Sequence, residues 1–131
     1  MSYNRIVVSN DYYYRMMIDI ISQGSGWIAF DTETTGLHLK QDTPFLLTIS
    51  ITNYTFALDL LQWDKELVQK VVDLFKNYEL AIGHNVKFDL HMLANIGITY
   101  NYDNLADTMT MARLSLETDE MQTIALKALA K

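Results

Sequence analysis

The chain of 131 residues contains no cysteine, one proline and five glycines. The absence of cysteine excludes disulfide bonds, thiolate metal sites and a cysteine nucleophile together. So little proline and glycine argues against a linker-like, collagen-like or low-complexity sequence. No apolar run approaches the roughly 18 to 20 residues of a membrane span, and residues 1–10 lack the apolar stretch and cleavage site of a secretory signal. We therefore expect a cytoplasmic protein with no membrane partner.

The remaining composition is that of a globular domain with an excess of acid. Apolar residues make up 50% of the chain, and its length fits one domain, so we expect residues 1–131 to form a single folded unit. Ten basic residues face 16 acidic ones, a net charge of −6. Because non-specific affinity for nucleic acids comes mainly from neutralised phosphates, this surface does not attract a polyanion by itself. Either the substrate is not a polyanion, or the acids gather where cations bind, or a partner supplies the affinity.

Hydrophobic patterning predicts an α/β or α+β domain built on a mixed sheet. Strands are expected at residues 5–9, 27–33, 45–52, 54–60, 80–82 and 98–102. Helices are expected at residues 11–22, 64–77, 87–96, 104–116 and 121–130. Asn53 marks a hairpin turn, Asp64 an N-cap and Gly97 a helix C-cap. The three strands between residues 27 and 60 can pair as an antiparallel meander.

Two carboxylates stand at the end of the apolar strand that begins at Trp27. Asp31 and Glu33 are two residues apart, so in a strand their side chains point to the same face. Two like charges held close are costly unless a cation or a proton compensates them. Hard divalent cations such as Mg²⁺ favour carboxylate oxygens. The pair is therefore either a metal-binding site at the edge of the sheet or two solvated acids at a strand end.

A third acid, Asp89, lies where the strand at 80–82 passes into the helix at 87–96. Asn85 can cap that helix, and an acid in the first turn is favoured by the helix dipole. Capping and the dipole explain Asp89 taken alone. They do not explain its combination with Asp31 and Glu33.

The two acidic segments together resemble a known family. Residues 31–37, Asp-Thr-Glu-Thr-Thr-Gly-Leu, are similar to the first motif of the DEDD 3′–5′ exonucleases. Residues 84–89, His-Asn-Val-Lys-Phe-Asp, resemble their second motif, and residues 105–109 resemble the segment that follows in the proofreading domains of bacterial and phage family A DNA polymerases. The resemblance covers residues 27–131, with both motifs in the right order on the expected elements.

The resemblance implies an RNase H-like fold and a two-metal hydrolysis with Mg²⁺ or Mn²⁺. The implied substrate is a single-stranded DNA 3′ end, released as nucleoside monophosphates. Asp31 would bridge both ions, Glu33 would bind the ion that activates water, and Asp89 would hold the second ion. A polymerase domain, in the same parent chain or complex, is the implied partner.

The same family pattern assigns substrate contacts. Leu37 matches the apolar residue that packs on the terminal base, while Thr34 and Asn85 match substrate-contacting positions. Asp107 is expected to start a helix, and to cap it or support the site from behind rather than bind metal.

One element of the family pattern is missing. The third motif, Tyr-x-x-x-Asp or His-x-x-x-x-Asp on a late helix, has no counterpart after the segment at 105–109. We therefore expect a domain cut short before its last helix, weak or inactive alone. A ribonuclease D-like RNA exonuclease and a non-catalytic scaffold in a replication complex remain as alternatives.

Overall fold

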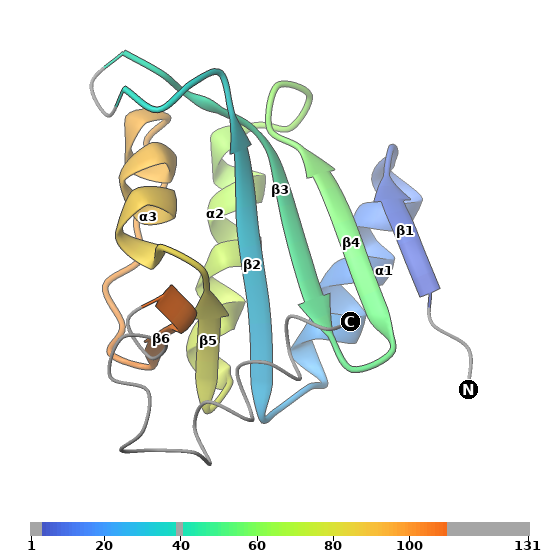
Figure 1. Cartoon of the computed structure of the whole chain (residues 1–131). Coiled ribbons are helices and arrows are strands. Elements are labelled where there is room, and N and C mark those ends of the chain that lie inside the picture. Colours follow the sequence, from blue (N-terminus) through green and yellow to red (C-terminus); the bar gives the residue numbers. More distant parts are fainter. Residues whose placement is uncertain (1–3, 39–40, 110–131) are drawn as a thin grey trace, which may run out of the picture.

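The computed structural model describes residues 4–38 and 41–109, which form a six-stranded sheet with helices against it (Figure 1). The strands are β1 (Asn4–Val8), β2 (Trp27–Thr34), β3 (Pro44–Ile51), β4 (Tyr54–Asp59), β5 (Leu80–Gly83) and β6 (Leu105–Asp107). The helices are α1 (Asp11–Ser22), α2 (Lys65–Asp73), the short 3₁₀ helix η1 (Leu74–Asn77) and α3 (Val86–Asn95). No helix among the described residues is long and apolar enough to cross a membrane.

The sheet is mixed, as the patterning predicts, and its strand order is β1-β4-β3-β2-β5-β6. Strands β2, β3 and β4 form the expected antiparallel meander, and Asn53 takes a positive φ of 74° in the turn between β3 and β4. Strands β2, β5 and β6 are mutually parallel neighbours. The carboxyl ends of parallel strands meet at one edge of a sheet, which is where ligands bind in open α/β folds. Residues after β2, β5 and β6 therefore come together.

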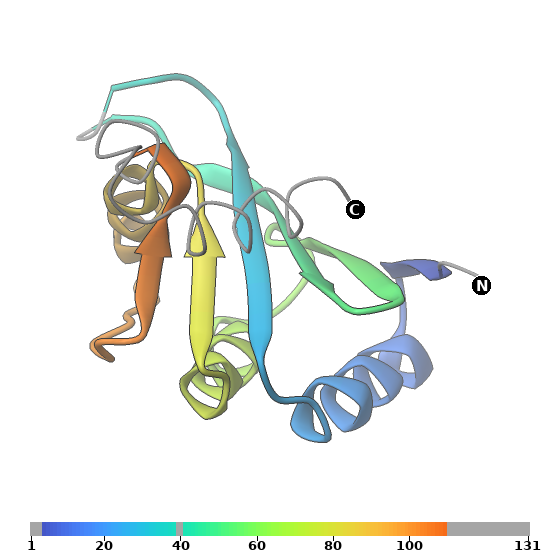
Figure 2. The ribbon, with the colours of Figure 1, turned by 60° about the horizontal axis from the view of Figure 1, so that its bottom comes forward.

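The main core lies between the sheet and the helices α1 and α2, which share one side of the sheet (Figure 2). Met17 of α1 and Val71 of α2 are fully buried against Ile28 and Phe56 of the sheet. Alternation along β2 turns Ile28 and Phe30 toward this core. The next residue on that face is Thr32, a polar side chain that is 7% exposed.

Helix α3 ends where the sequence predicts, at a glycine in the left-handed conformation. Gly97 has φ +85°, and its N–H donates to Ala94 O at 2.9 Å. The N–H of Ile98 donates to Leu93 O at 2.9 Å, and both of these side chains are 1% exposed. These two bonds and the apolar contact form a Schellman cap.

The prediction of a strand at residues 98–102 is wrong, because these residues form no strand in the structure. Ile98 is used by the helix cap, and the backbone of Thr99 pairs with a side chain rather than a strand. Gln69 of α2 accepts from Thr99 N at 2.9 Å and donates to Thr99 O at 2.8 Å. An amide side chain reproduces the donor and acceptor of a neighbouring strand, so no ladder forms here.

The helix expected at residues 104–116 is wrong at its start, where β6 pairs with β5 instead. Asn104 does not cap a helix of its own. Its Nδ2 donates to Phe75 O and Tyr78 O, both at 2.9 Å, which ties the entry of β6 to the end of η1. Residues 108 and 109 are helical as expected, and the remainder of that helix and the one expected at 121–130 lie outside the described residues.

The helix expected at residues 64–77 is present in two parts, because α2 tightens into η1 over its last turn. Asp64 occupies the N-cap position, but its side chain makes no capping hydrogen bond. The position of the cap is confirmed, and the expected capping bond is absent.

Replacing Gly97 by alanine should lower the free energy of unfolding by about 1 to 2 kcal/mol, because L residues are unfavourable in the left-handed region. The added Cβ would also lie 2.7 Å from Lys65 Cδ, a contact that the flexible lysine relieves. Gly97→Ala in a Lys65→Ala background should therefore keep most of the loss. Urea unfolding of both variants measures this, and an unchanged midpoint in Gly97→Ala would contradict the cap.

Candidate active site

The end of β2 presents two carboxylates on one face and a buried hydroxyl on the other. Asp31 and Glu33 are exposed, while Thr32 between them points into the core. Burial raises the pKa of the Asp31 carboxyl above its ordinary value, and the charge of Glu33 raises it further. The structure thus brings the two acids close enough to repel each other, as their spacing predicts.

Asp89, in the first turn of α3, is a buried acid that is 2% exposed. The Thr32 hydroxyl donates to its Oδ1 at 2.5 Å. Its Oδ2 has no hydrogen-bond partner among the residues that the structure describes. Burial raises the pKa of Asp89 to about 6, and the Thr32 hydrogen bond opposes this shift while the charge of Asp31 adds to it. The third acid is therefore held against β2 with one oxygen open.

The turn that leads into α3 is organised by Asp107. Asn85 at the N-cap has φ 68° and ψ 59°, a left-handed conformation that asparagine tolerates better than most residues. Asp107 Oδ1 accepts from Asn85 N and Oδ2 accepts from Val86 N, each at 2.9 Å. Asp107 ends β6 and also starts a helix as expected, because residues 108 and 109 are helical and its Oδ1 accepts from Met109 N at 3.0 Å. It caps α3, and so it supports the helix that carries Asp89.

Two of the three expected substrate-binding residues line the same cleft. Leu37, 83% exposed, and Asn85 line one cleft of about 360 Å³ with Lys87, Phe88 and His91 of α3. Thr34 is not among the residues lining that cleft. Its hydroxyl donates to Gly36 O at 2.7 Å and so shapes the loop that carries Leu37.

Several side chains at this edge escaped the sequence reasoning. Phe88 matches a core residue by type, yet it is half-buried and lines the cleft. Lys87 and His91 are one helical turn apart, a spacing that a search for basic pairs at i and i+4 would have found. Thr32 carried no signal, because a threonine inside an apolar strand is common.

The acids suit a hard divalent cation that keeps other ligands. The described residues, 4–38 and 41–109, contain no group of three His, Cys, Asp or Glu side chains arranged to hold a metal ion. Mg²⁺ is usually bound by one or two carboxylates and completes its shell with water and substrate phosphates. The open Oδ2 of Asp89 and the repelling pair Asp31 and Glu33 are groups that a cation would stabilise. The donor set therefore fits such an ion.

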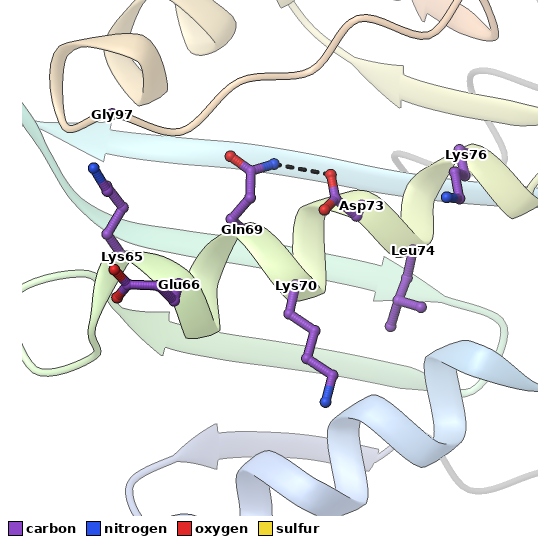
Figure 3. A pocket seen from close by; sticks show the side chains of 8 residues that line it. All are labelled: Lys65, Glu66, Gln69, Lys70, Asp73, Leu74, Lys76 and Gly97. Atoms are coloured by element: carbon purple, nitrogen blue, oxygen red, sulfur yellow. Dashed lines mark hydrogen bonds between the residues drawn. The ribbon is translucent and has the colours of Figure 1, made fainter.

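A larger cleft, about 460 Å³, runs along α2 and contains none of these acids (Figure 3). It is lined by Lys65, Glu66, Gln69, Lys70, Asp73, Leu74, Lys76 and Gly97. Basic and acidic side chains alternate in it, and Gln69 is bonded to Asp73 at 2.9 Å. The side chains of this cleft do not suggest a catalytic or metal-binding group. Its Lys70 therefore serves below as a control position away from the acids.

Sequence comparison connects the chain with polymerase-associated nucleases. Residues 12–131 match the protein family described as 3′–5′ exonuclease. The chain is 34% identical over 112 residues to DNA polymerase DpoZ of Salmonella phage PMBT28, covering 79% of this chain and 16% of the polymerase. It is 32% identical over 88 residues to DNA polymerase DpoZ of Acinetobacter phage SH-Ab 15497, covering 66% and 14%. The chain thus spans a small part of the length of these curated relatives.

Solved structures share the fold at low sequence identity. The EXO domain of Aedes aegypti Nibbler has a TM-score of 0.70 at 13% identity, with 88% of this chain and 58% of that chain covered. Escherichia coli RNase D, an exoribonuclease involved in structured RNA processing, has a TM-score of 0.63 at 19% identity, covering 86% and 28%. These likenesses bear out the expected RNase H-like mixed sheet.

Ionisation of Asp89 should destabilise the fold as the pH rises. Its pKa of about 6 lies above the ordinary value of 3.8, so between these pH values the folded state keeps a proton that the unfolded state has released. Stability therefore falls from about pH 4 to about pH 6 and stays low above that. Asp89→Asn should gain on the order of 2 kcal/mol more at pH 7.5 than at pH 3.5 in urea unfolding without divalent metal. The exposed Glu33→Gln is the control, and an equal effect of Asp89→Asn at both pH values would contradict the shift.

Removal of the α3 cap should loosen the turn at Asn85. Asp107→Ala leaves three N–H groups, of Asn85, Val86 and Met109, without this acceptor, a loss of about 1 to 3 kcal/mol. Hydrogen exchange at the amides of Asn85 and Val86 should accelerate at least tenfold relative to the wild type. The exposed Asp103→Ala is the matched control, and unchanged protection in Asp107→Ala would show that the cap is dispensable.

Proposed function

This chain belongs to the 3′–5′ exonuclease family, the DEDD exonucleases of family A DNA polymerases, and from that membership we propose that it forms the proofreading site of a longer polymerase. The proposed reaction is hydrolysis of the 3′-terminal phosphodiester of single-stranded DNA to nucleoside monophosphates. Residues 1–131 would belong to one domain of that enzyme. Family members are metal-dependent nucleases, and Mg²⁺ or Mn²⁺ is the proposed ion.

The observation that carries the proposal is the buried Asp89 carboxylate, which keeps an unpartnered oxygen and is influenced by the charge of Asp31. A native buried polar atom without a partner calls for an explanation such as a bound ion or a catalytic role. We assign Asp31, Glu33 and Asp89 as the residues that would hold the ions. When bound, divalent ions activate water and neutralise the charge that develops on the phosphate.

The cleft beside α3 would position the 3′ end of the bound DNA. Leu37 and Phe88 offer apolar surface to the terminal base, and stacking on aromatic rings is tolerant of base identity. Asn85 lines the same cleft, where its side-chain amide would bond the terminal nucleotide. Thr34 would act indirectly, because its hydrogen bond to Gly36 shapes the loop that carries Leu37.

The net charge of −6 is consistent with a part of a larger enzyme. A free-standing nuclease requires basic surface to hold the phosphate backbone. The relatives are polymerases of which this chain matches 16% and 14%, so we propose that a polymerase domain of the parent supplies that grip. The proposed location is the cytoplasm, where such a polymerase meets its template.

RNA is the alternative substrate, because the shared fold also occurs in RNase D. The assay therefore offers 5′-labelled single-stranded DNA and RNA of the same sequence with Mn²⁺, with EDTA as the blank. DNA shortened from its 3′ end faster than RNA supports the proposal, and the reverse order favours the alternative.

Mn²⁺ should raise the thermal midpoint of the chain by a few degrees, because a ligand that binds only the folded state stabilises it. Asp31→Ala should lose this shift, and Lys70→Gln in the α2 cleft should keep it. In the parent polymerase, Asp31→Ala should abolish 3′ shortening. Shortening that survives Asp31→Ala would disprove the assignment, and a wild-type chain with neither shift nor cleavage would favour the scaffold role.

A further inference from the structure

We propose that His84 is a substrate-positioning residue whose Nε2 accepts a hydrogen bond from a sugar hydroxyl at the 3′ end of the bound strand. The inference rests on the proposed function, since it assigns a further contact within the same site. It is independent of the metal, because it concerns the orientation and hydrogen-bonding capacity of one imidazole.

The position of His84 follows from the pairing of β2 with β5. The parallel register pairs Trp27 with Leu80 and Ala29 with Ile82. Two residues further along, the same register sets His84 beside Asp31 at the carboxyl edge of the sheet. The two side chains are close enough to interact electrostatically. His84 is exposed at this edge of the sheet and is therefore accessible to a bound strand.

A hydrogen bond to a buried hydroxyl group fixes the orientation of the His84 ring. His84 Nδ1 lies 2.8 Å from Oγ1 of Thr108, a residue that is only 6% exposed. The same hydroxyl donates to Gly83 O at 3.3 Å. A hydroxyl has a single proton to donate. In the proposed arrangement Thr108 donates it to Gly83 and accepts from His84, so Nδ1 carries the proton of the neutral ring.

Fixing the proton on Nδ1 makes Nε2 a hydrogen-bond acceptor. Among the described residues, no hydrogen bond is made to His84 Nε2. Phosphate oxygens are acceptors and do not pair with it. The donors on the backbone of a 3′ terminus are the sugar hydroxyls, the 3′-hydroxyl in DNA and also the 2′-hydroxyls in RNA. Neutral His84 therefore recognises a sugar hydroxyl.

His91 provides the matched comparison. It lies one helical turn into α3, lines the neighbouring cleft and is exposed like His84. No hydrogen bond among the described residues fixes its ring. A contact specific to the pinned imidazole should therefore depend on His84 and not on His91.

The first experiment measures binding of the whole 131-residue chain to 5′-labelled oligonucleotides by fluorescence anisotropy, with Ca²⁺ as the divalent ion. The strands end in a deoxynucleotide, a 2′,3′-dideoxynucleotide or a ribonucleotide. If the 3′-hydroxyl is bound, its removal should weaken wild-type binding about fivefold, the factor expected of one net hydrogen bond. If the 2′-hydroxyl is bound, the ribonucleotide end should gain a similar factor.

In either case His84→Ala should erase the difference between the ends, whereas His91→Ala should keep it. Differences of equal size in His84→Ala and wild type would overturn the assignment of His84 alone. A wild type that binds all three ends equally would overturn this assignment and leave the proposed function in place.

The second experiment reads the proton directly. Long-range ¹H–¹⁵N spectra of the histidine rings should show the Nδ1–H form of neutral His84 in the wild type. Thr108→Val preserves the shape of the buried side chain and removes the acceptor, so it should shift His84 toward the Nε2–H form. An Nε2–H ring in the wild type would overturn the proposal, whatever the binding data show.

Discussion

The hydrogen bond from the Thr32 hydroxyl to Asp89 joins the central strand β2 to helix α3 inside the protein. One oxygen of this carboxylate is bonded and the other has no described partner. This bond connects the first turn of α3 to β2 and holds the third acid at the strand that carries Asp31. The arrangement of the candidate site depends on this contact more than on any other.

The same contact makes the site costly to the fold. A buried carboxylate is favoured as an anion only when hydrogen bonds or a cation compensate its lost hydration. At Asp89 the Thr32 hydrogen bond compensates only part of the lost hydration. The uncompensated part raises the pKa of this carboxyl to about 6. The apolar core offsets this cost, and it reaches the site, because Phe30 of β2 and Val86 of α3 belong to the same buried cluster as the residues of α1 and α2.

Strand β6 contributes to the site from a distance along the chain. Its pairing with β5 carries Asp107 to the start of α3 and Thr108 to the ring of His84. One short strand therefore sets both the conformation of Asn85 and the orientation of the imidazole. The sequence pattern predicted a helix here, because local spacing does not reveal that an asparagine at 104 bonds the end of η1.

Local rules were sufficient for much of this protein. The alternation that turns Asp31 and Glu33 to one face, the meander with its turn at Asn53 and the α3 cap at Gly97 are short-range effects, so the sequence alone determined them. The motifs in residues 31–37 and 84–89 also indicated the family before the fold was known. Only the tertiary structure decided which oxygen of Asp89 is open, that Asp107 also caps α3, and which nitrogen of His84 has no described partner. Those contacts join residues 57, 22 and 24 positions apart, and no local pattern specifies them, because the pairing of β2, β5 and β6 creates them.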